Sequence, residues 1–266
     1  MRQAYFVLTI SLMLLLTFHL SGYTTSAYAA PISKGTDGDA STADPRSLEL
    51  NEKGVQAVKA RDYDLAERLF REALAADSYN LTAVHNLASL YLVNKKEQAA
   101  IELLKSTVNK HPEDPDLFLR LGDAFFSAEN VSDALTNYEK SFALDSTRFE
   151  TVSRLATTYS LKSDFANAEK FLLRAVEIKP NDLDSLANLS SVFLANAKAN
   201  QAIGTAKRAL QVRPEGRIYV TLGSAYEMLE DYSNAIISFE KAVQLGGIED
   251  IEELNQHISK LKQSQG

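Results

Sequence analysis

A repeat of 34 residues constrains this chain more than any other feature, because it places the same residue types at the same positions over most of the sequence. Small residues recur once per repeat, at Gly54, Ala88, Gly122, Ala156, Ser190 and Gly223. An alanine follows each of them by twelve residues, at Ala66, Ala100, Ala134, Ala168, Ala202 and Ala235. An internal period of this length indicates stacked copies of one supersecondary unit.

Larger residues complete the pattern. Nine residues before the alanine stand Tyr91, Phe125, Tyr159, Phe193 and Tyr226, with Ala57 in the first repeat. Four residues after it stand Phe70, Leu104, Tyr138, Leu172, Ala206 and Phe239. A breaker or capping residue closes each repeat, at Ser78, Pro112, Ser146, Pro180, Pro214 and Gly247. The repeats therefore run over 47–80, 81–114, 115–148, 149–182, 183–215 and 216–249, the fifth being one residue shorter.

Each repeat contains two segments of about a dozen residues with apolar positions at helical intervals, separated by a polar turn. We expect the small residue and the alanine to let the two helices approach closely. One helix pair cannot bury its apolar face alone, so the pairs must stack into an all-α solenoid. After the last repeat, residues 250–266 carry a stripe of Ile251, Leu254, Ile258 and Leu261, which predicts a capping helix.

The pattern resembles the tetratricopeptide repeat (TPR), whose consensus places small residues, aromatics, alanine and proline at these positions. The resemblance implies a right-handed superhelix of helix-turn-helix pairs. It also implies that the first helix of each pair lines a concave groove, which commonly holds a peptide from a partner. Ala57, Ala206 and the absence of tryptophan depart from the pattern and are expected to loosen packing locally.

Residues 1–29 have the three parts of a secretory signal. Arg2 gives the positive start, an apolar run extends to Leu20, and Ala27-Tyr28-Ala29 forms an A-x-A exit, after which we place cleavage. The prediction is an exported protein, in a bacterial periplasm because the chain has no cysteine for disulfides. A secreted protein and an inner-membrane anchor with an uncleaved signal are the alternatives, and only the anchor would contact a membrane. Residues 30–46 are predicted to be a flexible acidic linker.

The sequence offers little for catalysis. A net charge of -7 disfavours nucleic-acid binding, and the absence of cysteine excludes thiol chemistry and cysteine-based metal sites. His85, His111 and His257 fall in separate segments without metal-ligand spacing, and we expect His111 and His257 at the surface. Phosphate-binding loops and nucleophile elbows are missing. We therefore expect a protein that is not an enzyme and has no cofactor or metal.

The TPR resemblance assigns groove positions to each first helix. These are Asn51, Val55, Val58, His85, Asn86, Ser89, Leu92, Leu119, Arg120, Asp123, Phe126, Ser153, Arg154, Thr157, Ser160, Ala187, Asn188, Ser191, Leu194, Val220, Thr221, Ser224 and Glu227. Within this set, the candidate partner-binding residues are Asn86, Leu92, Arg120, Asp123, Phe126, Arg154 and Asn188.

Two interpretations of these candidates stay open. The ladder of Asn86, Arg120, Arg154 and Asn188 either hydrogen-bonds a partner's backbone and carboxylates or pairs with nearby acids such as Glu150 and Asp116. Similarly, Leu92, Leu119 and Phe126 either anchor a partner or fill space between the helices.

One known use of the fold is disfavoured. TPR domains that grip a chaperone's C-terminal carboxylate use a clamp of Lys, Asn, Asn, Lys and Arg. The matching positions here are Asn51, Val55, Asn86, Asp116 and Arg120, of which two agree and Asp116 has the wrong sign.

The sequence thus predicts an exported TPR scaffold or adaptor that binds a protein or peptide in its concave groove. By resemblance, small exported TPR proteins support the assembly of cell-envelope complexes. The alternative is an accessory module that regulates an envelope enzyme or delivers its substrate. The partner, the pathway and the oligomeric state are not specified by the sequence.

Overall fold

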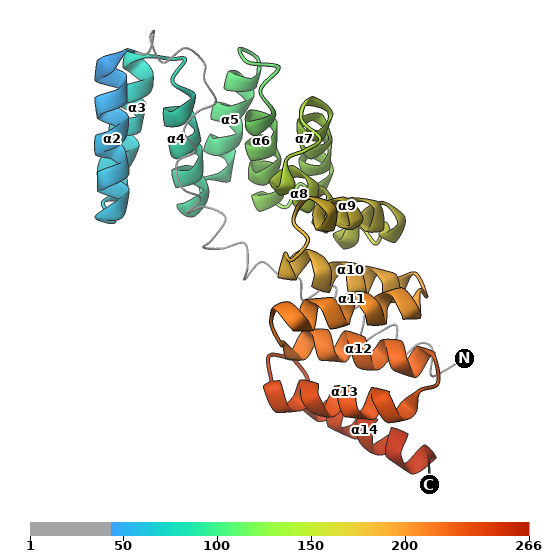
Figure 1. Ribbon diagram of the computed structural model, residues 1–266. Coiled ribbons are helices and arrows are strands. Elements are labelled where there is room, and N and C mark those ends of the chain that lie inside the picture. Colours follow the sequence, from blue (N-terminus) through green and yellow to red (C-terminus); the bar gives the residue numbers. More distant parts are fainter. Residues whose placement is uncertain (1–43, 266) are drawn as a thin grey trace. The chain divides into compact units, whose positions relative to one another are not determined.

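The computed structural model describes residues 44–265, which contain thirteen helices and no strand. The described chain divides into two compact units, residues 44–146 and 147–265. In the first unit, antiparallel helix pairs stand side by side (Figure 1). Its helices are α2 (Pro45–Lys59), α3 (Tyr63–Ala76), α4 (Leu81–Val93), α5 (Glu97–Val108), α6 (Pro115–Ser127) and α7 (Val131–Leu144).

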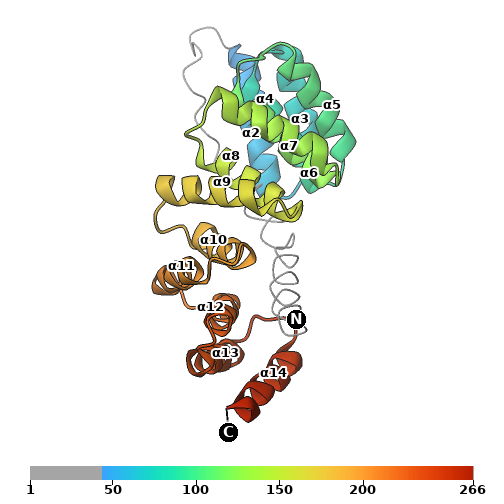
Figure 2. The ribbon, with the colours of Figure 1, turned by 90° about the vertical axis from the view of Figure 1, so that its right-hand side faces the viewer.

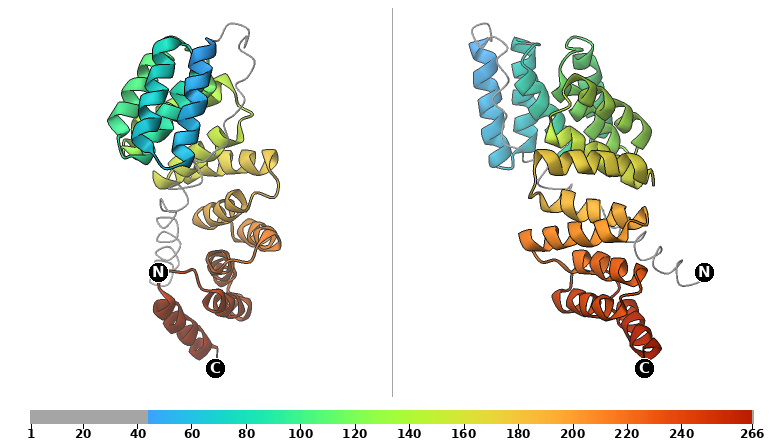
Figure 3. Two further views of the ribbon diagram at one scale, coloured as in Figure 1. Left: turned by 90° about the vertical axis from the view of Figure 1, so that its left-hand side faces the viewer. Right: turned by 45° about the vertical axis from the view of Figure 1, so that its right-hand side comes forward.

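The second unit repeats the same arrangement. Its helices are α8 (Phe149–Leu161), α9 (Phe165–Ile178), α10 (Leu183–Ala195), α11 (Ala199–Val212), α12 (Gly216–Met228), α13 (Tyr232–Leu245) and α14 (Ile251–Ser264). Figure 2 shows α10 to α13 nearly end-on as a stack, and Figure 3 shows α14 following α13. The all-α solenoid predicted from the repeat is confirmed, since every described element is a helix and the helices stack in pairs.

The predicted signal, 1–29, and most of the predicted linker, 30–46, lie outside the described residues. The helix of the first repeat begins at Pro45, two residues earlier than the predicted repeat boundary at Ser47. Asp44 explains the difference, because its carboxylate accepts hydrogen bonds from the backbone N–H groups of Arg46 and Ser47. Such a cap, followed by proline at the first helical position, is a strong helix start.

The turn inside each helix pair has one geometry throughout. A residue with positive φ follows the first helix at Arg61, Lys95, Glu129, Ser163, Ala197 and Glu230. The backbone N–H of the next residue donates to the carbonyl five residues earlier, as from Lys96 to Tyr91 and from Asn130 to Phe125. This is a Schellman ending, which satisfies the last carbonyls of a helix and usually uses glycine at the left-handed position. No glycine occupies it here, so the turns lack their usual sequence signal.

In the repeats whose small residue is glycine, that glycine makes room for a ring on the second helix. A Cβ placed on Gly54 would lie 2.5 Å from the ring of Phe70, and one on Gly223 would lie 2.5 Å from the ring of Phe239. Phe70 and Phe239 are almost completely buried. The two helices therefore approach closely, as expected. The space left by the missing Cβ of the glycine is filled by the aromatic side chain of the second helix.

The C-terminal helix closes the second unit. Leu254, Ile258 and Leu261 of α14 pack with Val220 and Phe239 in one apolar cluster. His257 lies in the same interface, where its ring contacts that of Phe239 edge-on at 5.5 Å. The expectation that His257 is a surface residue is wrong, because the residue is only 8% exposed. His257 is buried because it lies on the same side of α14 as the apolar residues Leu254, Ile258 and Leu261.

The first helices form one side of each unit, which we call the inner face. In the first unit α2 contacts α4 and α4 contacts α6, and in the second unit α10 contacts α12. Within each unit, the second helices pack against the first helices of their own and the following pair. Over residues 44–265, none of the helices has the length and hydrophobicity that a membrane span requires.

Candidate protein-binding face

Polar side chains connect neighbouring first helices along the inner face of the first unit. Asn86 Nδ2 on α4 donates to Asn51 Oδ1 on α2 at 2.9 Å. Arg120 Nη1 on α6 donates to Ser89 Oγ on α4 at 3.3 Å. Asn86, Ser89 and Arg120 are half-buried, so each combines a contact within the solenoid with partial exposure on the inner face.

Asp123 is held in place from the second helix of its own pair. Tyr138 Oη on α7 donates to Asp123 Oδ1 at 2.8 Å, while the tyrosine ring is fully buried beside Gly122. The hydroxyl therefore reaches from the interior to a half-buried carboxylate on the inner face. Because the ring of Tyr138 is buried, its hydroxyl is held in one place, and the hydrogen bond from it orients the carboxylate of Asp123.

An apolar row runs beside these polar residues. Val58, Leu92 and Phe126 occupy the same position in α2, α4 and α6, and all three keep part of their surface exposed. Leu119 is different, with 9% exposure. Of the two interpretations, Leu119 belongs to the packing between helices, whereas Leu92 and Phe126 are positioned where a partner can reach them.

The second unit presents the other two ladder residues. Arg154 on α8 and Asn188 on α10 are both half-buried. The Oδ1 atom of Asn188 is buried and accepts no hydrogen bond within the described chain. Further along the same face, the hydroxyls of Ser191 on α10 and Thr221 on α12 lie 3.3 Å apart.

A last contact joins the inner face to the capping helix. His257 Nε2 on α14 lies 2.8 Å from Glu227 Oε2 on α12, and both side chains are about nine-tenths buried. The sequence reasoning missed this pair because it treated His257 as a surface residue. The spacing of 30 residues equals that between Ser191 and Thr221, and this recurring separation of contacts between neighbouring helices was the signal that would have found the pair.

Eight predicted groove positions are not accessible. The apolar ones, Leu119, Ala187, Leu194 and Val220, are between 2% and 9% exposed, so they do not line a groove. The polar ones, Asn51, Thr157, Thr221 and Ser224, are between 3% and 8% exposed. Leu119, Ala187 and Val220 share one position, on the side of each first helix that faces the following first helix. Val220, for example, packs against α14. Solenoid stacking therefore covers a position that the resemblance assigned to ligand contact.

One of the acids near the ladder forms an ion pair outside it. Glu150 pairs with Lys179 at 3.4 Å, and that contact does not involve the ladder. In the part of the chain that the structure describes, no group of three or more histidine or carboxylate side chains is arranged to hold a metal ion. What the inner face offers is hydrogen bonding through amides, a guanidinium and hydroxyls, next to an apolar row.

Stacked helix pairs with a polar and apolar inner face define a repeat scaffold of the α-solenoid class. Family models of the tetratricopeptide repeat match residues 57–121, 98–147, 150–182 and 216–245. The chain belongs to the tetratricopeptide repeat family.

Known relatives are similar at a distance. The chain is 25% identical over 237 residues to the BBSome complex member BBS4 of Bos taurus, covering 76% of this chain and 46% of that protein. It spans less than half the length of this relative and of the Drosophila melanogaster homologue.

Solved structures share the fold. The crystal structure of MamA superposes with a TM-score of 0.57 at 22% identity, over 59% of this chain and 93% of that one. YrrB, described as a TPR protein with an unusual peptide-binding site, gives a TM-score of 0.54 at 16% identity, over 69% of this chain and 92% of that one. At these identities the similarity establishes the fold alone.

Proposed function

We propose that this chain is an exported scaffold or adaptor that holds a segment of a partner protein on its inner face and supports the assembly of a cell-envelope complex. The observation that carries the proposal is the pairing of two rows in the first unit. The apolar row is Val58, Leu92 and Phe126, and the polar row is Asn86, Arg120 and Asp123. Apolar anchors beside oriented hydrogen-bonding groups are the usual composition of a peptide-binding surface.

The polar groups on this face are oriented before any partner arrives. Asn86 and Arg120 are tied to the preceding helix, and Asp123 is tied to Tyr138. Side chains that already occupy one rotamer lose less conformational entropy on binding, which favours affinity. The geometry also suits an elongated segment, because equivalent residues recur on successive helices.

Export is a separate part of the proposal and rests on the sequence of residues 1–29, which the structure does not describe. Intact-mass measurement of the chain recovered from its native envelope tests it directly. A mature N-terminus at Ala30 supports export with cleavage. A chain that retains residues 1–29 supports the anchored alternative and contradicts the cleavage site.

Capture from the native envelope fraction tests the binding face. We compare the wild type with Arg120→Ala/Phe126→Ala and with Glu102→Ala, a control on the exposed side of α5. The expected result is a partner that is retained by the wild type and by Glu102→Ala but lost by the double variant. Equal capture by all three proteins, with folding verified by circular dichroism, would place the binding site elsewhere.

A further inference from the structure

The outer side of α11 differs in charge from every other second helix of the described pairs. α3, α5, α7, α9 and α13 each contain at least one Asp or Glu, whereas α11 has the sequence ANQAIGTAKRALQV and contains none. Its exposed residues share one helical face, which we call the α11 face: Asn200, Gln201, Gly204, Lys207, Arg208, Gln211 and Val212. Among the second helices of the described pairs, α11 alone has no acidic residue.

Gly204 is the second unusual feature of this face. It lies in the interior of α11, is exposed, and a Cβ built on it meets no atom within 4 Å. Gly54, Gly122 and Gly223, by contrast, each make room for an aromatic ring. Glycine in a helix interior lowers helix stability relative to alanine. It is useful there when another backbone must come close to the helix, because glycine has no side chain in the way. No part of the described chain makes that approach at Gly204.

The two cations of the α11 face are held without carboxylates. Lys207 Nζ lies 5.5 Å from the centre of the Tyr226 ring, and Arg208 Nη2 donates to the Pro180 carbonyl at 3.2 Å. The cations at the two ends of the helix are instead paired, Lys198 with Glu169 and Arg213 with Glu215. The middle of the face therefore presents positive charge that an acidic partner would complement.

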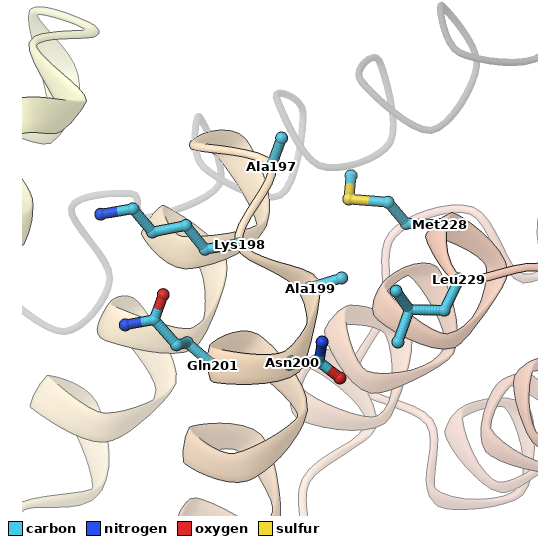
Figure 4. Close-up of a pocket in the computed structure, with 7 residues that line it drawn as sticks. All are labelled: Ala197, Lys198, Ala199, Asn200, Gln201, Met228 and Leu229. Carbon is cyan, nitrogen blue, oxygen red and sulfur yellow. The ribbon is translucent and has the colours of Figure 1, made fainter.

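An open hollow of about 230 Å³ adjoins the same face at the start of α11. It is lined by Ala197, Lys198, Ala199, Asn200, Gln201, Met228 and Leu229. Figure 4 shows Ala199 and Asn200 on the side of α11 toward Met228 and Leu229, with Lys198 and Gln201 on the other side. Leu229 is 44% exposed, so the hollow offers an apolar wall to an incoming side chain.

We propose that the α11 face and this hollow form a second docking surface, which binds an acidic helical segment of a partner protein. The partner's backbone crosses at Gly204, an apolar side chain enters the hollow beside Met228 and Leu229, and its carboxylates meet Lys207 and Arg208. From Asn200 to Arg208 the helix rises about 12 Å, or two turns, so the anchor and the acids of the partner lie about seven or eight residues apart. A nucleic acid is a poorer fit, because two cations neutralise too few phosphates.

The test uses a synthetic helical peptide as the probe. It is about 18 residues long and carries one leucine, two glutamates seven and eight residues later, and alanine or glutamine elsewhere. A matched peptide has glutamine in place of both glutamates. Fluorescence anisotropy with the full mature chain measures binding, and a zero-length carboxyl-to-amine cross-linker followed by peptide mapping locates it.

Two variants and one control decide the outcome. Lys207→Glu is expected to weaken binding of the acidic peptide at least about tenfold. Gly204→Gln is expected to weaken it similarly by steric exclusion while raising the thermal midpoint, so the loss cannot come from unfolding. Lys260→Glu, an equal charge reversal at an exposed position of α14, is expected to change binding less than about twofold.

Support requires that the acidic peptide binds better than its neutral match and cross-links to Lys207 in preference to Lys260. The proposal is overturned if the wild type does not distinguish the two peptides or if either α11 variant binds like the wild type. Stronger binding of a DNA duplex than of the acidic peptide would also overturn it. Arg120→Ala/Phe126→Ala on the inner face is expected to leave peptide binding unchanged, which separates this surface from the proposed function.

Discussion

Gly122 and Tyr138 form a matched pair across α6 and α7, since a Cβ on Gly122 would lie 2.5 Å from both Cδ1 and Cε1 of the tyrosine ring. The ring is completely buried, and its hydroxyl donates to Asp123 Oδ1 at 2.8 Å. One glycine thus permits the ring position, and the ring position orients a carboxylate on the inner face. The packing of the pair and the geometry of the candidate site are therefore linked.

Gly122→Ala is expected to destabilise the protein by about 1–3 kcal/mol, because the added methyl overlaps a ring that has no free space. Gly204→Ala is the matched control, with the same added methyl in a helix but open space around it. It is expected to stabilise the protein by up to about 1 kcal/mol. Urea unfolding of both variants checks the prediction. Equal effects would mean that helix propensity, and not the ring, decides the cost at Gly122.

Removing only the tyrosine hydroxyl separates packing from orientation. Tyr138→Phe keeps the ring but loses the donor to Asp123, and we expect a loss of about 1 kcal/mol in unfolding free energy. Asp123→Ala in the Tyr138→Phe background should then cost less than in the wild type. A double-mutant cycle measures this coupling, and additive effects would contradict the contact.

The repeat predicted the fold because its positions have simple physical roles. Small residues such as Gly54 and Gly223 recur wherever a ring must fit, and fully buried alanines such as Ala134 recur where helices meet. The polar turns between the helices were also located from the sequence, although their left-handed positions hold residues such as Glu129 and Ala197 in place of glycine.

The candidate site was less predictable than the fold. Asn86, Arg120 and Asp123 lie on the inner face of the first helices, but exposure depends on how consecutive pairs stack. Leu119 and Val220 are covered for that reason, and His257 is buried because the capping helix turns it toward Glu227. A single-sequence pattern assigns a residue to a helix face, whereas burial also requires knowledge of the neighbouring helix.

The His257–Glu227 contact predicts how firmly α14 is attached. Both side chains are nearly buried, so removing one partner leaves the other without its hydrogen bond. We expect His257→Ala to cost about 1–3 kcal/mol and to speed hydrogen exchange in α14 more than in α8. Lys260→Ala, on the exposed side of α14, serves as the control. Unchanged exchange in α14 of the His257 variant would show that the apolar stripe alone holds the helix.

Glu215 predicts a loss of stability in acid. Burial raises the pKa of its carboxyl, but hydrogen bonds from Arg217 and Arg213 outweigh burial, and the net pKa is lowered. Arg217 also donates to Asp184 Oδ1 at 2.7 Å, so Glu215 lies in a network that joins α12 to α10. A pKa that is lower in the folded state gives stability that is present above the unfolded-state pKa and is lost as the pH falls through the folded-state pKa.

Glu215→Gln is therefore expected to be less stable than the wild type at neutral pH by about 1 kcal/mol and to show a shallower decline in acid. Thermal midpoints measured between neutral pH and about pH 3 check this. Glu252→Gln, at an exposed position of α14, provides the comparison. If Glu215→Gln and the wild type lose stability in parallel, other carboxylates govern the acid response.

Substitution of Asn188 is expected to affect stability and partner binding differently. Its Oδ1 atom is buried without a donor in the described chain, and such an acceptor costs about 1–3 kcal/mol. Asn188→Leu replaces the amide with an apolar group of similar shape, so we expect the unfolding free energy to be unchanged or raised. The same change removes a member of the proposed binding ladder and is expected to weaken partner capture. If Asn188→Leu is destabilised, the buried Oδ1 accepts a hydrogen bond in solution. If the variant is stable and captures the partner normally, Asn188 does not belong to the binding face.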